Sequence, residues 1–167
     1  MNTAIIAYSH TGSAAALGRA LSAALDAELF LLEEERKRPT KDFFVGGMQA
    51  AFQLGSALQA LPDVGQTDVI VLGMPVWAGS TPPAINTILK KLDFQNKTVF
   101  AFVTKADPAL QAPQKLAERL KASIEHKGGA LKGVFAMPVG EHPLSRDAAQ
   151  AQATLWAEEI RTLLERR

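Results

Sequence analysis

The sequence contains no cysteine, and this single absence excludes several kinds of chemistry. A chain of 167 residues without cysteine can form no disulfide bond, no thiolate metal site and no cysteine nucleophile. Histidine is also scarce, because the chain has only three, and they lack the short spacing that is typical of metal ligands. We therefore expect no metal site, and we interpret His126 and His142 as surface residues.

Long hydrophobic runs and an excess of one charge sign are also missing. No stretch reaches the ~20 apolar residues that a membrane-spanning helix needs, and the first residues lack the basic start of a secretory signal. The formal net charge is +1, and lysine and arginine are spread along the chain rather than gathered in a basic patch. We expect a cytoplasmic protein that binds neither a membrane nor nucleic acid.

What the sequence does contain is a regular alternation of short apolar runs and longer amphipathic stretches. The apolar runs predict strands at residues 4–8, 28–32, 68–72, 99–103 and 131–139. The amphipathic stretches predict helices at residues 13–25, 82–92, 109–126 and 146–165. Apolar strands separated by helices are typical of a parallel sheet covered on both faces, so residues 1–167 are predicted to form one α/β domain with strand order 2-1-3-4-5.

Residues 42–56 give a weaker signal. Phe44, Met48 and Phe52 lie four apart, which places them on one face of a helix. The pair Gly46-Gly47 lies inside the same stretch, and glycine disfavours a helix interior. We therefore expect a helix with an irregular start.

The junction between the first strand and the first helix could hold a phosphate. It consists of Ser9, His10, Thr11, Gly12 and Ser13. The free N–H groups of a helix N-terminus attract anions, and the three hydroxyl groups of this loop could add donors. Gly12 permits a backbone shape that other residues disfavour. The same residues also fit a simple turn in which Ser13 caps the helix and His10 faces solvent.

The loop after the third strand could hold an aromatic ring. Residues 73–83 include Trp77, flanked by Pro75 and Gly79. A tryptophan on a loop at the end of a strand needs an explanation, and a planar ligand stacked on its indole would provide one. Trp156, in contrast, lies on a predicted amphipathic helix, and we interpret it as a core residue.

A third loop, residues 104–108, follows the fourth strand and should reach the same edge of the sheet. Lys105 is the basic residue that topology brings nearest to the other two loops. Asp107 precedes Pro108 and is equally consistent with a cap for the next helix. The composition of this loop alone assigns it no role.

The first two loops together resemble those of the flavodoxin family. Its members carry a Ser/Thr-x-Thr-Gly-x-Thr loop after the first strand and a Gly-x-Pro-x-aromatic-x-Gly loop after the third, matched here by residues 9–13 and 73–79. The resemblance implies a flavodoxin-like three-layer sandwich, noncovalent FMN, and electron transfer at the flavin without catalytic side chains. The implied FMN contacts are Ser9, His10, Thr11, Gly12, Ser13 and Ala14 at the phosphate, Pro75, Val76, Trp77, Ala78 and Gly79 at the ring, and Thr104, Lys105, Ala106 and Asp107 in the third loop.

Two departures from the family pattern leave three functions open. Ala14 replaces the usual threonine, which removes one phosphate hydroxyl, and the chain lacks the strong acidity of electron-carrying flavodoxins. The first function is an FMN electron carrier that works with a redox partner protein such as a flavin reductase. The second is an NAD(P)H-dependent quinone or FMN reductase, and the third is a binding or regulatory domain without flavin.

Overall fold

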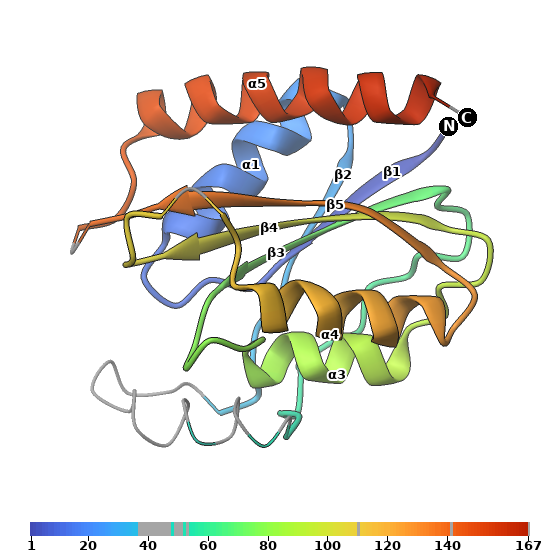
Figure 1. Cartoon of the computed structure of the whole chain (residues 1–167). Coiled ribbons are helices and arrows are strands. Elements are labelled where there is room, and N and C mark those ends of the chain that lie inside the picture. The colour runs from blue at the N-terminus through green and yellow to red at the C-terminus, as the bar shows by residue number, and fades with distance from the viewer. Residues whose placement is uncertain (37–47, 49–51, 53, 110, 141, 167) are drawn as a thin grey trace.

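The computed structural model describes residues 1–36, 48, 52, 54–109, 111–140 and 142–166 (Figure 1). The labelled elements are five strands and four helices, which alternate along the chain except that β3 follows β2 directly. The strands are β1 (Thr3–Ala7), β2 (Glu28–Leu31), β3 (Val69–Pro75), β4 (Thr98–Lys105) and β5 (Ala130–Pro138). The helices are α1 (Ser13–Leu25), α3 (Pro83–Lys91), α4 (Gln114–Glu125) and α5 (Arg146–Glu165).

All five strands are parallel and form one sheet in the order β2-β1-β3-β4-β5, as the sequence predicts. α1 and α5 cover one face of the sheet, and α3 and α4 cover the other (Figure 1). Both faces of the central strands are therefore buried, which explains why these strands read as continuous apolar runs. The three-layer arrangement is the predicted one.

Aromatic side chains fill the face of the sheet under α1 and α5. Trp156 is 5% exposed, and its indole stacks on the rings of Phe102 and Phe135 with centroid distances of 5.7 and 5.6 Å. A Cβ added at Gly73 on β3 would overlap the Phe102 ring. Position 73 therefore needs glycine, because a larger residue would have no space. The burial of Trp156 confirms its predicted place in the core.

Three predicted boundaries are wrong by two residues or more. β4 continues through Thr104 to Lys105, although the apolar run predicted its end at residue 103 and placed both residues in the third loop. β3 continues to Pro75, although Gly73, Met74 and Pro75 had the composition of a loop, because residues 73–75 pair with residues 102–104 of β4. α4 begins at Gln114 and not at residue 109, because Pro113 disfavours helical backbone at the residue before it. The proposed helix at residues 42–56 lies mostly outside the described residues.

Two kinds of feature are absent from the described part of the chain. None of its helices is long and apolar enough to cross a membrane. Within the same residues, no group of three or more His, Asp or Glu side chains could hold a metal ion. His126 and His142 are exposed, as predicted.

Candidate functional site

The three candidate loops follow neighbouring strands and open at the same edge of the sheet. β1 pairs with β3 and β3 pairs with β4, so the carboxyl ends of these three strands lie side by side. Ligands of open parallel sheets bind outside the carboxyl ends of the strands, where connections leave toward opposite faces. Here the chain leaves β1 for α1 on one face and leaves β3 for α3 on the other.

The first loop turns sharply at Gly12. Its φ is +101°, which is the left-handed region that glycine adopts without a steric penalty. The Gly12 N–H donates to the Ser9 Oγ at 3.1 Å, so Ser9 closes the turn from inside the loop. No side chain caps α1. Its first N–H groups therefore point toward the loop without a partner from the helix itself.

Ser13 and Ala14 are both buried at the start of α1. Ser13 is 1% exposed, and its Oγ accepts a hydrogen bond of 3.0 Å from the N–H of Leu144 in the loop before α5. The Ala14 methyl group is buried among the core residues under α1. Ala14 can therefore contact a phosphate only through its backbone N–H group. The Ser13 hydroxyl accepts the Leu144 N–H and keeps its own hydrogen as a donor, and the Thr11 side chain is exposed.

The loop after β3 contains a tight two-residue turn that presents Trp77. The Trp77 N–H donates to the Ser80 carbonyl at 3.0 Å, and the Ser80 N–H donates back at 2.8 Å. Ala78 and Gly79 between them have φ values of +48° and +70°. Positive φ at both central positions is the pattern of a type I′ hairpin turn. Ala78 pays a steric penalty there, and such strain is typical of functional loops.

The Trp77 indole connects the first loop with the loop after β3. It is half-buried, and its ring meets the rings of Tyr8 and His10 edge-on, with centroid distances of 5.8 and 5.5 Å. His10 is therefore packed against an aromatic ring and does not simply face solvent. Pro75 and Val76, at the base of the turn, are also half-buried.

A buried acid supports this aromatic group, and sequence reasoning missed it. The Tyr8 hydroxyl donates to the Glu34 Oε2 at 2.8 Å, and Glu34 is 8% exposed. Glu34 follows β2 and forms an isolated antiparallel bridge with Leu58. Nothing in the local sequence pattern marks Glu34, because its partner Tyr8 lies 26 residues earlier.

The third loop has a buried first part and an exposed tip. Thr104 and Lys105 are 4% and 6% exposed, and the Thr104 carbonyl accepts the Val76 N–H at 2.9 Å. The Lys105 Nζ donates to the Asp107 carbonyl at 3.1 Å. Ala106 and Asp107 are exposed. The Asp107 carboxylate accepts the Ala109 N–H and so closes a turn rather than capping α4.

Arg119 of α4 is a second residue that sequence reasoning missed. Its side chain is half-buried, and its Nη1 donates to the Ser80 Oγ in the Trp77 turn. Ser80 itself is 3% exposed. The two residues are 39 positions apart, so no short motif could indicate the contact.

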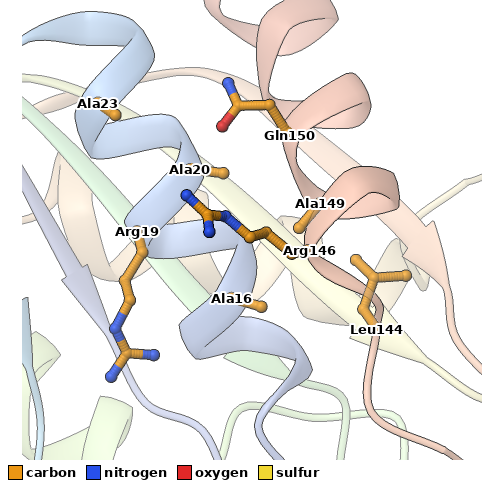
Figure 2. A pocket seen from close by; sticks show the side chains of 8 residues that line it. All are labelled: Ala16, Arg19, Ala20, Ala23, Leu144, Arg146, Ala149 and Gln150. Carbon is orange, nitrogen blue, oxygen red and sulfur yellow. The ribbon is translucent and has the colours of Figure 1, made fainter.

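A separate groove lies between α1 and α5, on the other face of the sheet from Arg119. It has a volume of about 450 Å³ and is lined mainly by alanines, with Arg19, Arg146 and Gln150 around it. Figure 2 shows the Arg146 side chain reaching from α5 across the groove toward α1, while Arg19 points away. None of the predicted site residues lines this groove.

The arrangement at the carboxyl edge suits the binding of a planar anionic ligand. It offers backbone donors at the start of α1, an indole between the first two loops, and a buried lysine under the third. The third loop also contains an ion pair, in which the Lys105 Nζ lies 3.9 Å from the Asp107 Oδ1. These donors and rings are suited to bind and orient such a ligand.

Comparison with known proteins gives a family match and a set of similar folds. A family model described as flavodoxin matches residues 48–136, just over half of the chain. The matched range includes the Trp77 turn and the third loop but begins after residues 9–14. No curated protein matches the sequence at a significant level.

Solved structures resemble the chain over nearly its whole length at low sequence identity. A protein of Bacteroides uniformis, provisionally named a flavoprotein, is 20% identical with a TM-score of 0.75 over 94% of this chain and 97% of the other. A flavoprotein of Lactobacillus acidophilus, solved in complex with FMN, is 21% identical with a TM-score of 0.68 over 81% and 92%. Megasphaera elsdenii flavodoxin is 18% identical with a TM-score of 0.56 over 93% and 98%. At these identities the similarity establishes the fold.

Proposed function

This chain belongs to the flavodoxin family, and from that premise we propose that it binds FMN noncovalently and carries electrons between redox partners. The phosphate would lie at the loop of residues 9–14, and the isoalloxazine ring would lie against Trp77. The flavin would supply the redox chemistry, and the protein would supply binding and orientation. A flavoprotein of the same fold, from Lactobacillus acidophilus, has been solved with FMN, which supports the choice of ligand.

One observation carries the proposal: the Trp77 indole contacts residues of the first loop. The 5.8 and 5.5 Å ring contacts with Tyr8 and His10 bring the candidate ring platform beside the candidate phosphate loop. FMN has its phosphate at one end and its ring at the other, joined by a short ribityl chain. A ligand of this shape could engage both loops at once.

The residues present fit this ligand with one change from the family pattern. Ala14 offers no hydroxyl group, and the Ser13 Oγ already accepts a hydrogen bond from the Leu144 N–H. The phosphate would therefore be held by backbone N–H groups at the start of α1, where the helix dipole also favours an anion. The exposed Thr11 hydroxyl adds one side-chain donor.

A titration of the apoprotein with FMN and with riboflavin tests the proposal. We expect FMN to bind at least about 10-fold more tightly, because a charge-assisted phosphate contact contributes on the order of 1.5–3 kcal/mol. Thr11→Glu should abolish FMN binding, since it places a carboxylate where the phosphate should lie. Thr154→Glu makes the same change at an exposed position on α5 and should leave the affinity unchanged.

Two results would count against the proposal. Equal affinities for FMN and riboflavin would mean that residues 9–14 hold no phosphate. Failure of the purified protein to bind either flavin would favour a binding or regulatory domain without flavin.

The carrier role is separated from the reductase role by its electron source. We expect slow or no reduction by NADPH or NADH alone and rapid reduction when a flavin reductase is added. The described loops provide one candidate phosphate site, and a bound nicotinamide cofactor would need donors for its own phosphates. Direct turnover at about 1 per second or faster, with a quinone as acceptor, would place the protein among the reductases and leave the FMN site intact.

A further inference from the structure

The Trp77 turn is held from outside by a residue of another helix. Arg119 lies in the second turn of α4, between the fully buried Leu116 and Leu120, and its guanidinium reaches the Ser80 Oγ. Ser80 exchanges two backbone hydrogen bonds with Trp77. Arg119 is therefore connected through Ser80 to the backbone that carries the Trp77 indole.

The guanidinium also has capacity beyond this contact. Arginine has five N–H donors in a planar fork. Among the residues that the structure describes, Ser80 is the acceptor recorded for Arg119. A half-buried cation with donors to spare thus lies beside the turn on which the flavin ring is proposed to stack. Its charge is screened less than that of a fully exposed residue.

We propose that Arg119 is a positioning residue for Trp77 and that its charge favours the reduced flavin. This inference rests on the proposed FMN site. Reduction of a flavin by two electrons with uptake of one proton leaves one additional negative charge on the ring. A nearby guanidinium stabilises that charge, so it raises the affinity for the reduced cofactor above that for the oxidised one.

The positioning role is tested in the apoprotein, without any flavin. The chain has two tryptophans, so its ¹H–¹⁵N NMR spectrum contains two indole signals, and Trp77→Phe identifies the one from Trp77. Arg119→Gln and Ser80→Ala should both shift or broaden the Trp77 signal and leave the Trp156 signal in place. In Arg119→Lys the Trp77 signal should lie between its positions in the parent protein and in Arg119→Gln, because lysine keeps the charge but lacks the planar fork.

The charge is tested with bound FMN by measuring the midpoint potential. Arg119→Gln should weaken reduced FMN about tenfold more than oxidised FMN, which corresponds to a potential about 30 mV lower for a two-electron couple. Arg119→Lys should keep most of the parent potential. The matched control is Lys121→Gln, which removes the same charge from an exposed position on α4 that pairs with Glu125 at 4.0 Å; it should leave the potential unchanged.

Two outcomes overturn the inference. One is a Trp77 indole signal that neither Arg119→Gln nor Ser80→Ala moves. The other is a potential shift in Arg119→Gln no larger than that in Lys121→Gln. If the parent protein binds no FMN, the proposed function and the charge effect both fail, and the indole signals still decide the positioning role.

Discussion

The two tryptophans of this protein show how the same side chain serves two regions of one domain. Trp156 is 5% exposed and lies in a stack of aromatic rings under α5. Trp77 is half-buried at the carboxyl edge, where it meets the rings of Tyr8 and His10 edge-on. Trp156 belongs to a cluster of buried apolar side chains, while Trp77 is half-buried and lies beside the imidazole of His10 and the Tyr8 ring.

The interactions that hold the two tryptophans in place also differ. Trp156 is held by packing alone, which is non-directional and changes little when one neighbour is replaced by a similar one. Trp77 is held by a strained turn, by hydrogen bonds through Ser80, and by a cation from α4. Directional support keeps an exposed ring in one orientation, which is what a binding surface requires. We therefore expect mutation of Trp156 to lower mainly the stability of the protein and mutation of Trp77 to lower mainly its affinity for FMN.

Trp156→Ala should have the largest effect. Truncation of a fully packed aromatic side chain leaves a cavity, and we expect a loss of about 3–5 kcal/mol in the free energy of unfolding. Urea denaturation followed by circular dichroism measures it. A loss below about 1 kcal/mol would contradict the placement of Trp156 in the core.

Trp77→Ala should mainly weaken FMN binding and should affect the free energy of unfolding less. We expect FMN to bind about 1–2 kcal/mol more weakly, from the loss of an aromatic contact and of buried area, with a smaller loss of stability than in Trp156→Ala. Flavin fluorescence, quenched in the parent complex, should recover in part. An unchanged affinity together with strong destabilisation would mean that Trp77 is a structural residue.

Ala78→Gly should have the smallest effect, and its sign is informative. The left-handed backbone at Ala78 costs about 1–2 kcal/mol for a residue with a Cβ, and the greater freedom of glycine in the unfolded chain offsets about 0.4–1 kcal/mol of the gain. We expect a net stabilisation of about 0.5–1 kcal/mol in urea denaturation. Ala106→Gly, at an exposed loop position without positive φ, is the control and should destabilise the protein.

Most of the fold was predictable because its signals are local. The bounds of α1 and α5 agree with the prediction, since each shows a clear amphipathic repeat. The parallel sheet followed from continuous apolar runs separated by helices. The end of β3 was not predictable, because Gly73 serves the Phe102 ring of the neighbouring strand and looks like a turn residue in the sequence.

The site was predictable in its backbone outline and less so in its side chains. The three loops and Trp77 were found from composition and spacing, and their grouping followed from topology. The roles of Ser13, Glu34 and Arg119 were not, because each depends on a partner at least 26 residues away. A serine Oγ in a phosphate-type loop can also accept a hydrogen bond from a distant segment, and only the packed structure shows that contact.

The hydrogen bond from the Leu144 N–H to the Ser13 Oγ also bears on how the protein is made. Its two partners are 131 residues apart, at opposite ends of the chain. Synthesis proceeds at about 5–20 residues per second, so the first loop waits on the order of ten seconds for this partner to be synthesised. During translation the loop of residues 9–14 therefore remains incomplete after β1, β3 and β4 have emerged, and it is finished only after the segment before α5 has been synthesised.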